Sequence, residues 1–140
     1  MQSVDIVRGV YASHEVRDTG GLVALLADDI VWWQAKHHPY ANPLGAWHGT
    51  AEVVAFVVEP LNTDWHGFIT RVDAMLDAGE QVVVHGEYTG VYKATGRAIE
   101  APMCVIYTVR NDRITEFRQF VDTAQIRWAV GIAADDLGPR

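Results

Sequence analysis

The chain has 140 residues, of which 49% are hydrophobic and 21% are charged, a composition typical of a globular protein with one core. Its net charge of −7 and the lack of any Lys/Arg-rich run argue against nucleic acid as a partner. No apolar run reaches the roughly 18 residues of a membrane span and the N-terminus lacks signal-peptide features, so we expect a single cytoplasmic domain over residues 1–140, without membrane contact.

The first part of the chain predicts two helices, a strand and a long loop. Apolar residues at spacings of three and four indicate an amphipathic helix over residues 4–17, and a short second helix follows over residues 22–26. Residues 30–34 are rich in β-forming side chains and predict a strand. Prolines, glycines and an asparagine in residues 35–49 predict an irregular loop, and loops of this length often carry function.

The rest of the chain predicts one more helix and then a run of strands. Thr50 is a plausible N-cap for a helix over residues 50–61. The spacing then changes to the alternation of strands with one apolar face, over residues 70–76, 82–92, 99–109 and 114–121. A helical tail with Ile126 and Trp128 follows. Helices first and an antiparallel meander afterwards indicate an α+β fold.

Three stretches carry a resemblance to a known family: LVALLADDIVW, VYKATGRAIEAPMCVIYTVRNDRITEF and RQFVDTAQI. The chain resembles SnoaL-like polyketide cyclases and ketosteroid isomerase relatives of the nuclear-transport-factor-like superfamily. The resemblance implies a cystatin-like cone, in which a curved antiparallel sheet wraps around three N-terminal helices. It also implies a ligand pocket at the mouth of the cone.

The resemblance leaves the reaction open. It implies cofactor-independent acid/base chemistry on a small apolar molecule, as in isomerisation, cyclisation, dehydration or epoxide opening; the alternative is a non-catalytic ligand-binding or assembly domain. The general base of ketosteroid isomerases falls on Gln34, and their oxyanion-hole Asp falls on Cys104. The arginine and aspartate of limonene epoxide hydrolases fall on Glu87 and Thr89. The one catalytic position that keeps its residue type in this sequence is the aspartate at the end of the last strand, Asp122.

Asp122 is therefore the predicted acid/base residue, because a carboxylate at the end of an apolar strand is desolvated. The alternative is that Asp122 caps the C-terminal helix. His85, Glu87 and Thr89 share one face of their strand, and the first two would assist catalysis if that face is concave. A solvated face or a dimer interface is the alternative. His37, on the long loop, is a further acid/base candidate.

Several side chains are predicted to contact a substrate: Tyr11, Trp33, Trp47, Phe56, Thr89, Met103 and Phe120. Tyr11 has this role because it matches the isomerase tyrosine in the resemblance. The other indoles are expected in the core or at an interface, namely Trp32, Trp65 and Trp128. We expect His14 on the surface of the first helix and Cys104 in the core.

No metal or cofactor is expected. The candidate ligands His37, His38 and His48 lack the spacing of a metal site, and the single cysteine cannot build a multi-thiolate site. There is no Gly-rich phosphate loop of the dinucleotide kind.

We further expect a homodimer. The helices can cover one face of the sheet, and the other face would leave apolar side chains for a partner copy to cover. The residues expected on that outer face are Val83, Tyr107 and Phe117.

Overall fold

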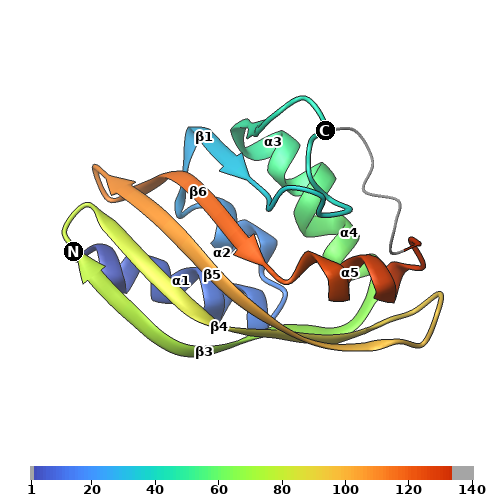
Figure 1. Ribbon diagram of the computed structural model, residues 1–140. Helices are drawn as coiled ribbons and strands as arrows, with labels where there is room; N and C mark the ends of the chain where they lie inside the picture. The colour runs from blue at the N-terminus through green and yellow to red at the C-terminus, as the bar shows by residue number, and fades with distance from the viewer. Residues whose placement is uncertain (1, 134–140) are drawn as a thin grey trace.

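The computed structural model describes residues 2–133 (Figure 1). Its elements are α1 (Ser3–Glu15), α2 (Thr19–Val23), β1 (Leu26–Trp33), β2 (Trp47–His48), α3 (Gly49–Val53), the π-helical turn η1 (Val54–Val58), α4 (Glu59–Asp64), β3 (Trp65–Ala78), β4 (Gln81–Tyr92), β5 (Ala98–Arg110), β6 (Arg113–Val121) and α5 (Thr123–Val130). This order confirms the predicted α+β fold. None of the helices described has both the length and the apolar composition to cross a bilayer.

One six-stranded sheet organises the molecule, with strand order β2-β1-β6-β5-β4-β3. Strands β3 to β6 form the predicted antiparallel meander. β1 pairs in parallel with β6, so the sheet is mixed rather than wholly antiparallel. Figure 1 shows the long strands β3, β4 and β5 curving past the helices.

A tight approach between β3 and β4 contributes to this curvature. The register of the pair shifts between Val72 and Ala74, and such a bulge bends a strand. Gly86 pairs with Val72 at this point. A Cβ atom on Gly86 would overlap the carbonyl oxygen of Arg71. The position therefore requires glycine for lack of space.

The helices cover one face of the sheet. α1 contacts β3, β4 and β6, α3 contacts β1, and α4 contacts β3. Ile6, Val7 and Val10 form the buried stripe of α1, as the spacing predicts. On β4 the buried side chains are Val82 and Val84, with Tyr88 further along the same face. The core lies between this concave face and the helices.

The prediction that Tyr107 and Phe117 lie on the outer face is wrong. Their exposed fractions are 1% and 4%, and the ring of Phe117 stacks on Trp32 with centroids 3.6 Å apart. Val83 does lie on the outer face, opposite Ile106. Alternation fixes which residues share a face, but where both sets are apolar it does not say which set is buried.

Candidate functional site

The three candidates on β4 lie on the outer face of the sheet. His85, Glu87 and Thr89 share a face, as predicted, but the opposite face is the one that packs on the core. Glu87 Oε1 lies 2.5 Å from Arg71 Nη2 in an ion pair across to β3. The structure therefore brings none of the three to the concave side, and the assisting role of His85 and Glu87 stays a prediction.

Asp122 has the local contacts of a helix cap. It is the N-cap residue of α5, and its Oδ1 accepts a hydrogen bond from the backbone N–H of Gln125 over 3.4 Å. Its Oδ2 accepts from the side-chain amide of Gln125 over 3.0 Å. The capping role is thus confirmed, while an acid/base role for Asp122 stays a prediction.

A small cavity of about 70 Å³ lies on the concave side, between the sheet and helices α1, α2, η1 and α4. Its apolar lining includes Val10, Leu22, Trp32, Val57, Val58, Leu61, Phe68 and Phe117. Its polar lining consists of Tyr11, His14, Gln34, His38, Thr70, Tyr88, Tyr107 and Gln119. Of the predicted substrate contacts, Tyr11 alone reaches this interior cavity.

Three tyrosines place hydroxyl groups around the interior cavity. The hydroxyls of Tyr11 and Tyr107 lie 2.8 Å apart and share a hydrogen bond. Burial raises the pKa of both phenols well above the ordinary value. Burial also raises the pKa of Tyr88 to about 12. All three groups therefore stay protonated near neutral pH and can donate hydrogen bonds.

His14 also lines the interior cavity, so the prediction of a surface position is wrong. Its Nε2 lies 2.9 Å from the backbone oxygen of Phe68. Arg17 Nη1 lies 3.0 Å from the same Nε2. The carbonyl oxygen fits a proton on Nε2 and the guanidinium fits a lone pair there, so the two contacts favour opposite tautomers of the ring. Burial and the nearby Arg17 lower the pKa of His14. The imidazole is therefore neutral near pH 7, and one of its two ring nitrogens carries a lone pair.

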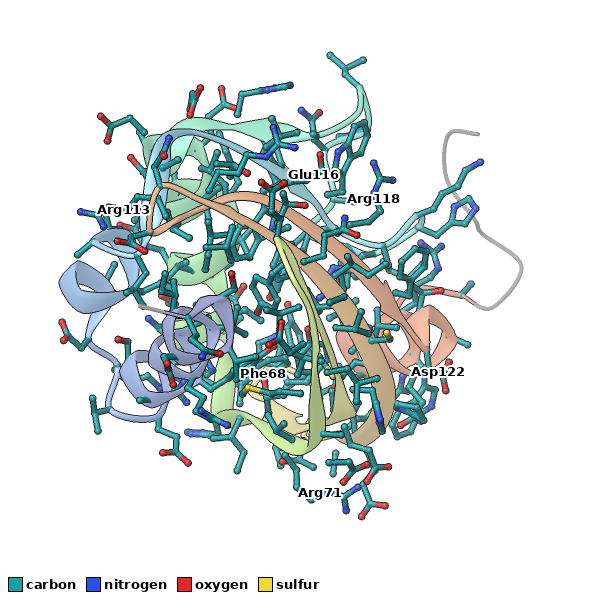
Figure 2. All side chains as sticks on the ribbon, turned by 90° about the vertical axis from the view of Figure 1, so that its left-hand side faces the viewer. Phe68, Arg71, Arg113, Glu116, Arg118 and Asp122 are labelled. Atoms are coloured by element: carbon teal, nitrogen blue, oxygen red, sulfur yellow. The ribbon has the colours of Figure 1, made fainter. Side chains whose placement is uncertain are left out.

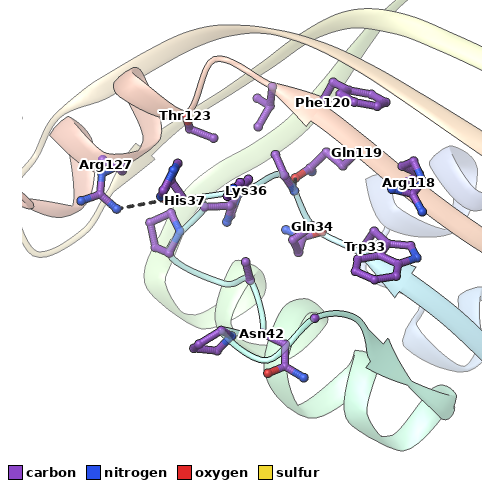
Figure 3. A pocket seen from close by; sticks show the side chains of 17 residues that line it. Trp33, Gln34, Lys36, His37, Asn42, Arg118, Gln119, Phe120, Thr123 and Arg127 are labelled. Carbon is purple, nitrogen blue, oxygen red and sulfur yellow. Dashed lines mark hydrogen bonds between the residues drawn. The ribbon is translucent and has the colours of Figure 1, made fainter. Parts of the chain in front are cut away.

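A larger cleft of about 730 Å³ lies on the other side of the same polar residues (Figure 3). It is bounded by residues 33–45, by the end of β6 and by the first turns of α5. Three predicted site residues line it: Trp33, His37 and Phe120. The remaining predicted contacts, Trp47, Phe56, Thr89 and Met103, line neither space.

Gln34, His38 and Gln119 line both the interior cavity and the cleft, and we call them the polar wall. Their exposed fractions are 9%, 6% and 6%. The side-chain oxygen of Gln119 accepts from the backbone N–H of Ala35 over 3.1 Å, and its amide donates to the Tyr88 hydroxyl over 3.0 Å. The side-chain oxygen of Gln34 accepts from the indole N–H of Trp32, a bond of 2.8 Å.

The polar wall has hydrogen-bond donors without protein partners. His38 Nδ1 accepts from the backbone N–H of Tyr40 over 2.9 Å, so the proton of its neutral ring is on Nε2. Burial lowers the pKa of His38 to about 3, which keeps the ring neutral at pH 7. Within residues 2–133, neither His38 Nε2 nor the amide nitrogen of Gln34 bonds to another group.

Three permanently charged cations line the cleft, and no aspartate or glutamate does. Arg127 from α5 is 8% exposed and donates to the backbone oxygen of His37 over 3.1 Å. Arg118 from β6 lies over the ring of Trp33, 4.8 Å from its centroid, and pairs with Glu116 at 3.6 Å. Lys36 is exposed on the loop. In Figure 3, Arg127 and Arg118 are at opposite ends of the lining.

Sequence reasoning missed most of the polar wall. Gln119 occupies an inward position of β6, in line with the buried Phe117. A polar side chain in an otherwise apolar inward set was the available signal, because such a group needs buried partners. For His38, on a loop, the sequence carries no pattern that indicates burial. Among the described residues, no three His, Cys, Asp or Glu side chains gather in a way that could hold a metal ion.

Comparison with known proteins gives a family and a set of related structures. The model of the SnoaL-like domain family matches residues 7–117. An NTF2-like protein from Burkholderia thailandensis is 30% identical over 93% of this chain and 98% of its own, with a TM-score of 0.86. NTF2-like proteins from Burkholderia xenovorans and Burkholderia pseudomallei are 29% and 25% identical, over 90% and 91% of this chain and 93% and 96% of theirs, with TM-scores of 0.77 and 0.82. No protein with a curated description matches.

Proposed function

This chain belongs to the SnoaL-like domain family, and we propose that it binds a small, largely apolar organic molecule carrying a carbonyl or hydroxyl oxygen. The fold is that of a family of cyclase-type, isomerase-type or ligand-binding proteins. The proposed site is the cleft together with the interior cavity, and the oxygen of the ligand lies at the polar wall between them.

The polar wall is the observation that carries this proposal. The side chains of Gln34 and His38 are buried, yet their free N–H groups reach the pocket surface, because Asn62 Oδ1 is the one fully buried side-chain atom without a partner among the described residues. Such groups are open to a ligand. Gln34 and His38 each present N–H groups that no protein atom among residues 2–133 accepts. A ligand oxygen would accept these bonds, while the rings of Trp33 and Phe120 would contact its apolar part.

The volumes of the interior cavity and the cleft determine which part of the ligand lies in each. An apolar cavity of about 150 Å³ holds benzene, so the interior cavity of about 70 Å³ has room for a smaller group only. The cleft, at about 730 Å³, falls in the range of roughly 300–1,000 Å³ that is usual for small-molecule sites. The main part of the ligand therefore lies in the cleft, and only a small polar end reaches towards the tyrosines.

Calorimetric titration with 2-naphthol tests this proposal, because the probe is neutral, aromatic and carries one hydroxyl. We expect a dissociation constant of about 1 mM or tighter. Ala41→Trp should fill the cleft and abolish binding, whereas Ala51→Trp, at an exposed position of α3, should leave it unchanged. Absence of binding, or equal binding to both variants, would refute the proposed site.

Cofactor-independent proton transfer is a second candidate, and His14 is the observation that favours it. Tyr11 and His14 are three residues apart on α1, so both face the interior cavity. A tyrosine hydroxyl would hydrogen-bond a substrate carbonyl, and the unprotonated ring nitrogen of the neutral His14 would accept a proton from the adjacent carbon. Isomerisation and aldol-type cyclisation both begin with this step.

Exchange of the methyl protons of acetone in D2O tests this candidate with a substrate of four non-hydrogen atoms. We expect the protein to accelerate exchange, and His14→Gln, which keeps a donor to Phe68, to reduce the rate about 100-fold. Tyr11→Phe should also slow exchange. A loss in Asp122→Asn with none in His14→Gln would instead assign the base to Asp122. No acceleration at all would remove the catalytic candidate for this step.

A further inference from the structure

The cleft differs in charge from the rest of the molecule. The chain has a formal net charge of −7, yet the charged side chains that line the cleft, Lys36, Arg118 and Arg127, are all cationic. Arg118 is paired with Glu116, which lies outside the lining (Figure 2). Lys36 and Arg127 have no carboxylate side chain beside them in the described lining, so an anion bound there would offset their charge.

Of the three cations, Arg127 gives the strongest evidence for a bound anion. The residue is 8% exposed, and its guanidinium donates to one backbone oxygen, that of His37. A guanidinium has five N–H donors, and a buried one is normally paired with a carboxylate or phosphate. Among residues 2–133, Arg127 forms no ion pair. Figure 3 shows its side chain at the end of the cleft beside the loop that carries Lys36 and His37.

The uncharged N–H groups in the cleft also favour a ligand with hydrogen-bond acceptors. The free amide of Gln34 and Nε2 of His38 are both N–H donors. The side-chain oxygens of the wall each accept one bond already, that of Gln34 from Trp32 and that of Gln119 from Ala35. A ligand group that offers acceptors and a negative charge therefore matches more of this surface than a donor group does.

We propose that the cleft recognises the carboxylate of a small aromatic or otherwise apolar acid, with Arg127 and Lys36 as its cationic partners. This inference rests on the proposed function and narrows its ligand class to organic acids. A carboxylate fits because Arg binds its two oxygens in a bidentate manner. The apolar part of the acid lies against Trp33, whose ring also contacts Arg118.

A matched pair of ligands tests the inference. 2-Naphthoate and 2-naphthamide have nearly the same shape and differ in charge. We expect calorimetry at low ionic strength to give naphthoate an affinity at least tenfold higher, and this advantage should shrink as salt is raised from 50 to 500 mM. Equal affinities, or a preference for the amide, would overturn the inference.

Single substitutions test which cations cause the higher affinity of naphthoate. Lys36→Gln, at an exposed position, should reduce the advantage of naphthoate several-fold, and Arg127→Gln should abolish it. Arg113→Gln removes the same charge from the exposed β5–β6 hairpin and should have no effect. An advantage that survives both cleft variants would overturn the inference even if Arg127→Gln proves unstable, because Lys36→Gln leaves the buried contacts intact.

The outcome also separates this inference from the proposed function. Binding of 2-naphthol and 2-naphthamide without any preference for naphthoate would leave the site correct and the ligand class wrong. If none of the three compounds binds at millimolar concentration, both the site and the ligand class are wrong.

Discussion

At the scale of residues, the central feature is a set of polar side chains buried where β6 meets the loop after β1. Gln34, His38 and Gln119 separate the interior cavity from the cleft. Gln119 is held on both sides, by Ala35 and by Tyr88. Gln34 and His38 each form one side-chain hydrogen bond, and their remaining N–H groups have no acceptor in the described chain. These side chains are therefore positioned by the fold and available to a ligand.

His38 makes the stability of the protein depend on pH. Its pKa is about 3 in the folded chain and 6.5 as the ordinary value, so the unfolded chain binds the proton more tightly. The stabilisation is therefore complete above pH 6.5 and is lost as the pH falls towards 3. Between pH 7.5 and 5.5 this residue alone should remove about 1.4 kcal/mol from the free energy of unfolding.

The comparison with His38→Asn checks this prediction. Asn keeps an acceptor for the Tyr40 N–H and does not titrate. Urea unfolding at several pH values should show the wild-type free energy of unfolding falling relative to that of the variant below pH 6.5. Parallel curves for the two proteins would contradict the prediction.

Asp122 gives a second prediction at this scale. Its carboxylate accepts two bonds from Gln125, and an asparagine can still accept at the N-cap position. We expect Asp122→Ala to lower the free energy of unfolding by about 1 kcal/mol and Asp122→Asn to change it by only a few tenths. Thermal or urea unfolding measures both. If Asn costs as much as Ala, capping does not account for the contacts of Asp122.

At the scale of elements, the curvature of the sheet depends on the close approach of β3 and β4. Gly86 faces the backbone of Arg71, where the β3 register shifts. An added methyl group has to displace backbone rather than a flexible side chain. This bend helps to form the concave face on which the interior cavity lies.

Gly86→Ala should therefore lower the free energy of unfolding by about 1–3 kcal/mol, the usual cost of overpacking. Gly20→Ala is the matched control: its added Cβ would meet only Asp18 Oδ1 at 3.8 Å, and alanine favours the helical state of α2. We expect the control to be neutral or stabilising in urea unfolding. A Gly86→Ala protein as stable as the wild type would show that the bulge can relax.

The helices and strands were largely predictable from the sequence, but which face of each strand is buried was not. Residues 4–17 and 82–92 have clear periods, and the structure has α1 and β4 close to those bounds. The strand over 70–76 extends to Trp65–Ala78, because pairing with β4 lengthens a segment whose ends lack a strong pattern.

The candidate site was less predictable, because it depends on which side of each strand is buried. His85 and Glu87 share a face as alternation requires, but no local signal places that face outside. The polar wall joins residues from a loop and from β6, far apart in the sequence. Its partners are tertiary contacts such as the bond from Gln119 to Tyr88, which spacing cannot reveal.

At the scale of the whole molecule, the sheet has one covered and one uncovered face. The outer side chains include Leu76 opposite Val83, and Val83 opposite Ile106. Leu76 is 51% exposed. This is an apolar surface that a second copy of the chain could cover.

We therefore predict a homodimer in solution through this outer face. Multi-angle light scattering should give about 31 kDa, twice the 15.5 kDa of one chain. Leu76→Glu should shift the mass towards that of a monomer, whereas Leu44→Glu, at a loop position with 95% exposure, should not. A monomer mass for the wild type at micromolar concentration would contradict the prediction.

The proposed site requires a ligand oxygen at the polar wall, and NMR of the isotopically labelled protein titrated with 2-naphthol tests this most directly. We predict that the largest shifts occur in the side-chain amides of Gln34 and Gln119 and in the imidazole of His38, while His85 on the outer face does not move. Shifts concentrated on the outer face, or no shifts at millimolar ligand, would contradict the account.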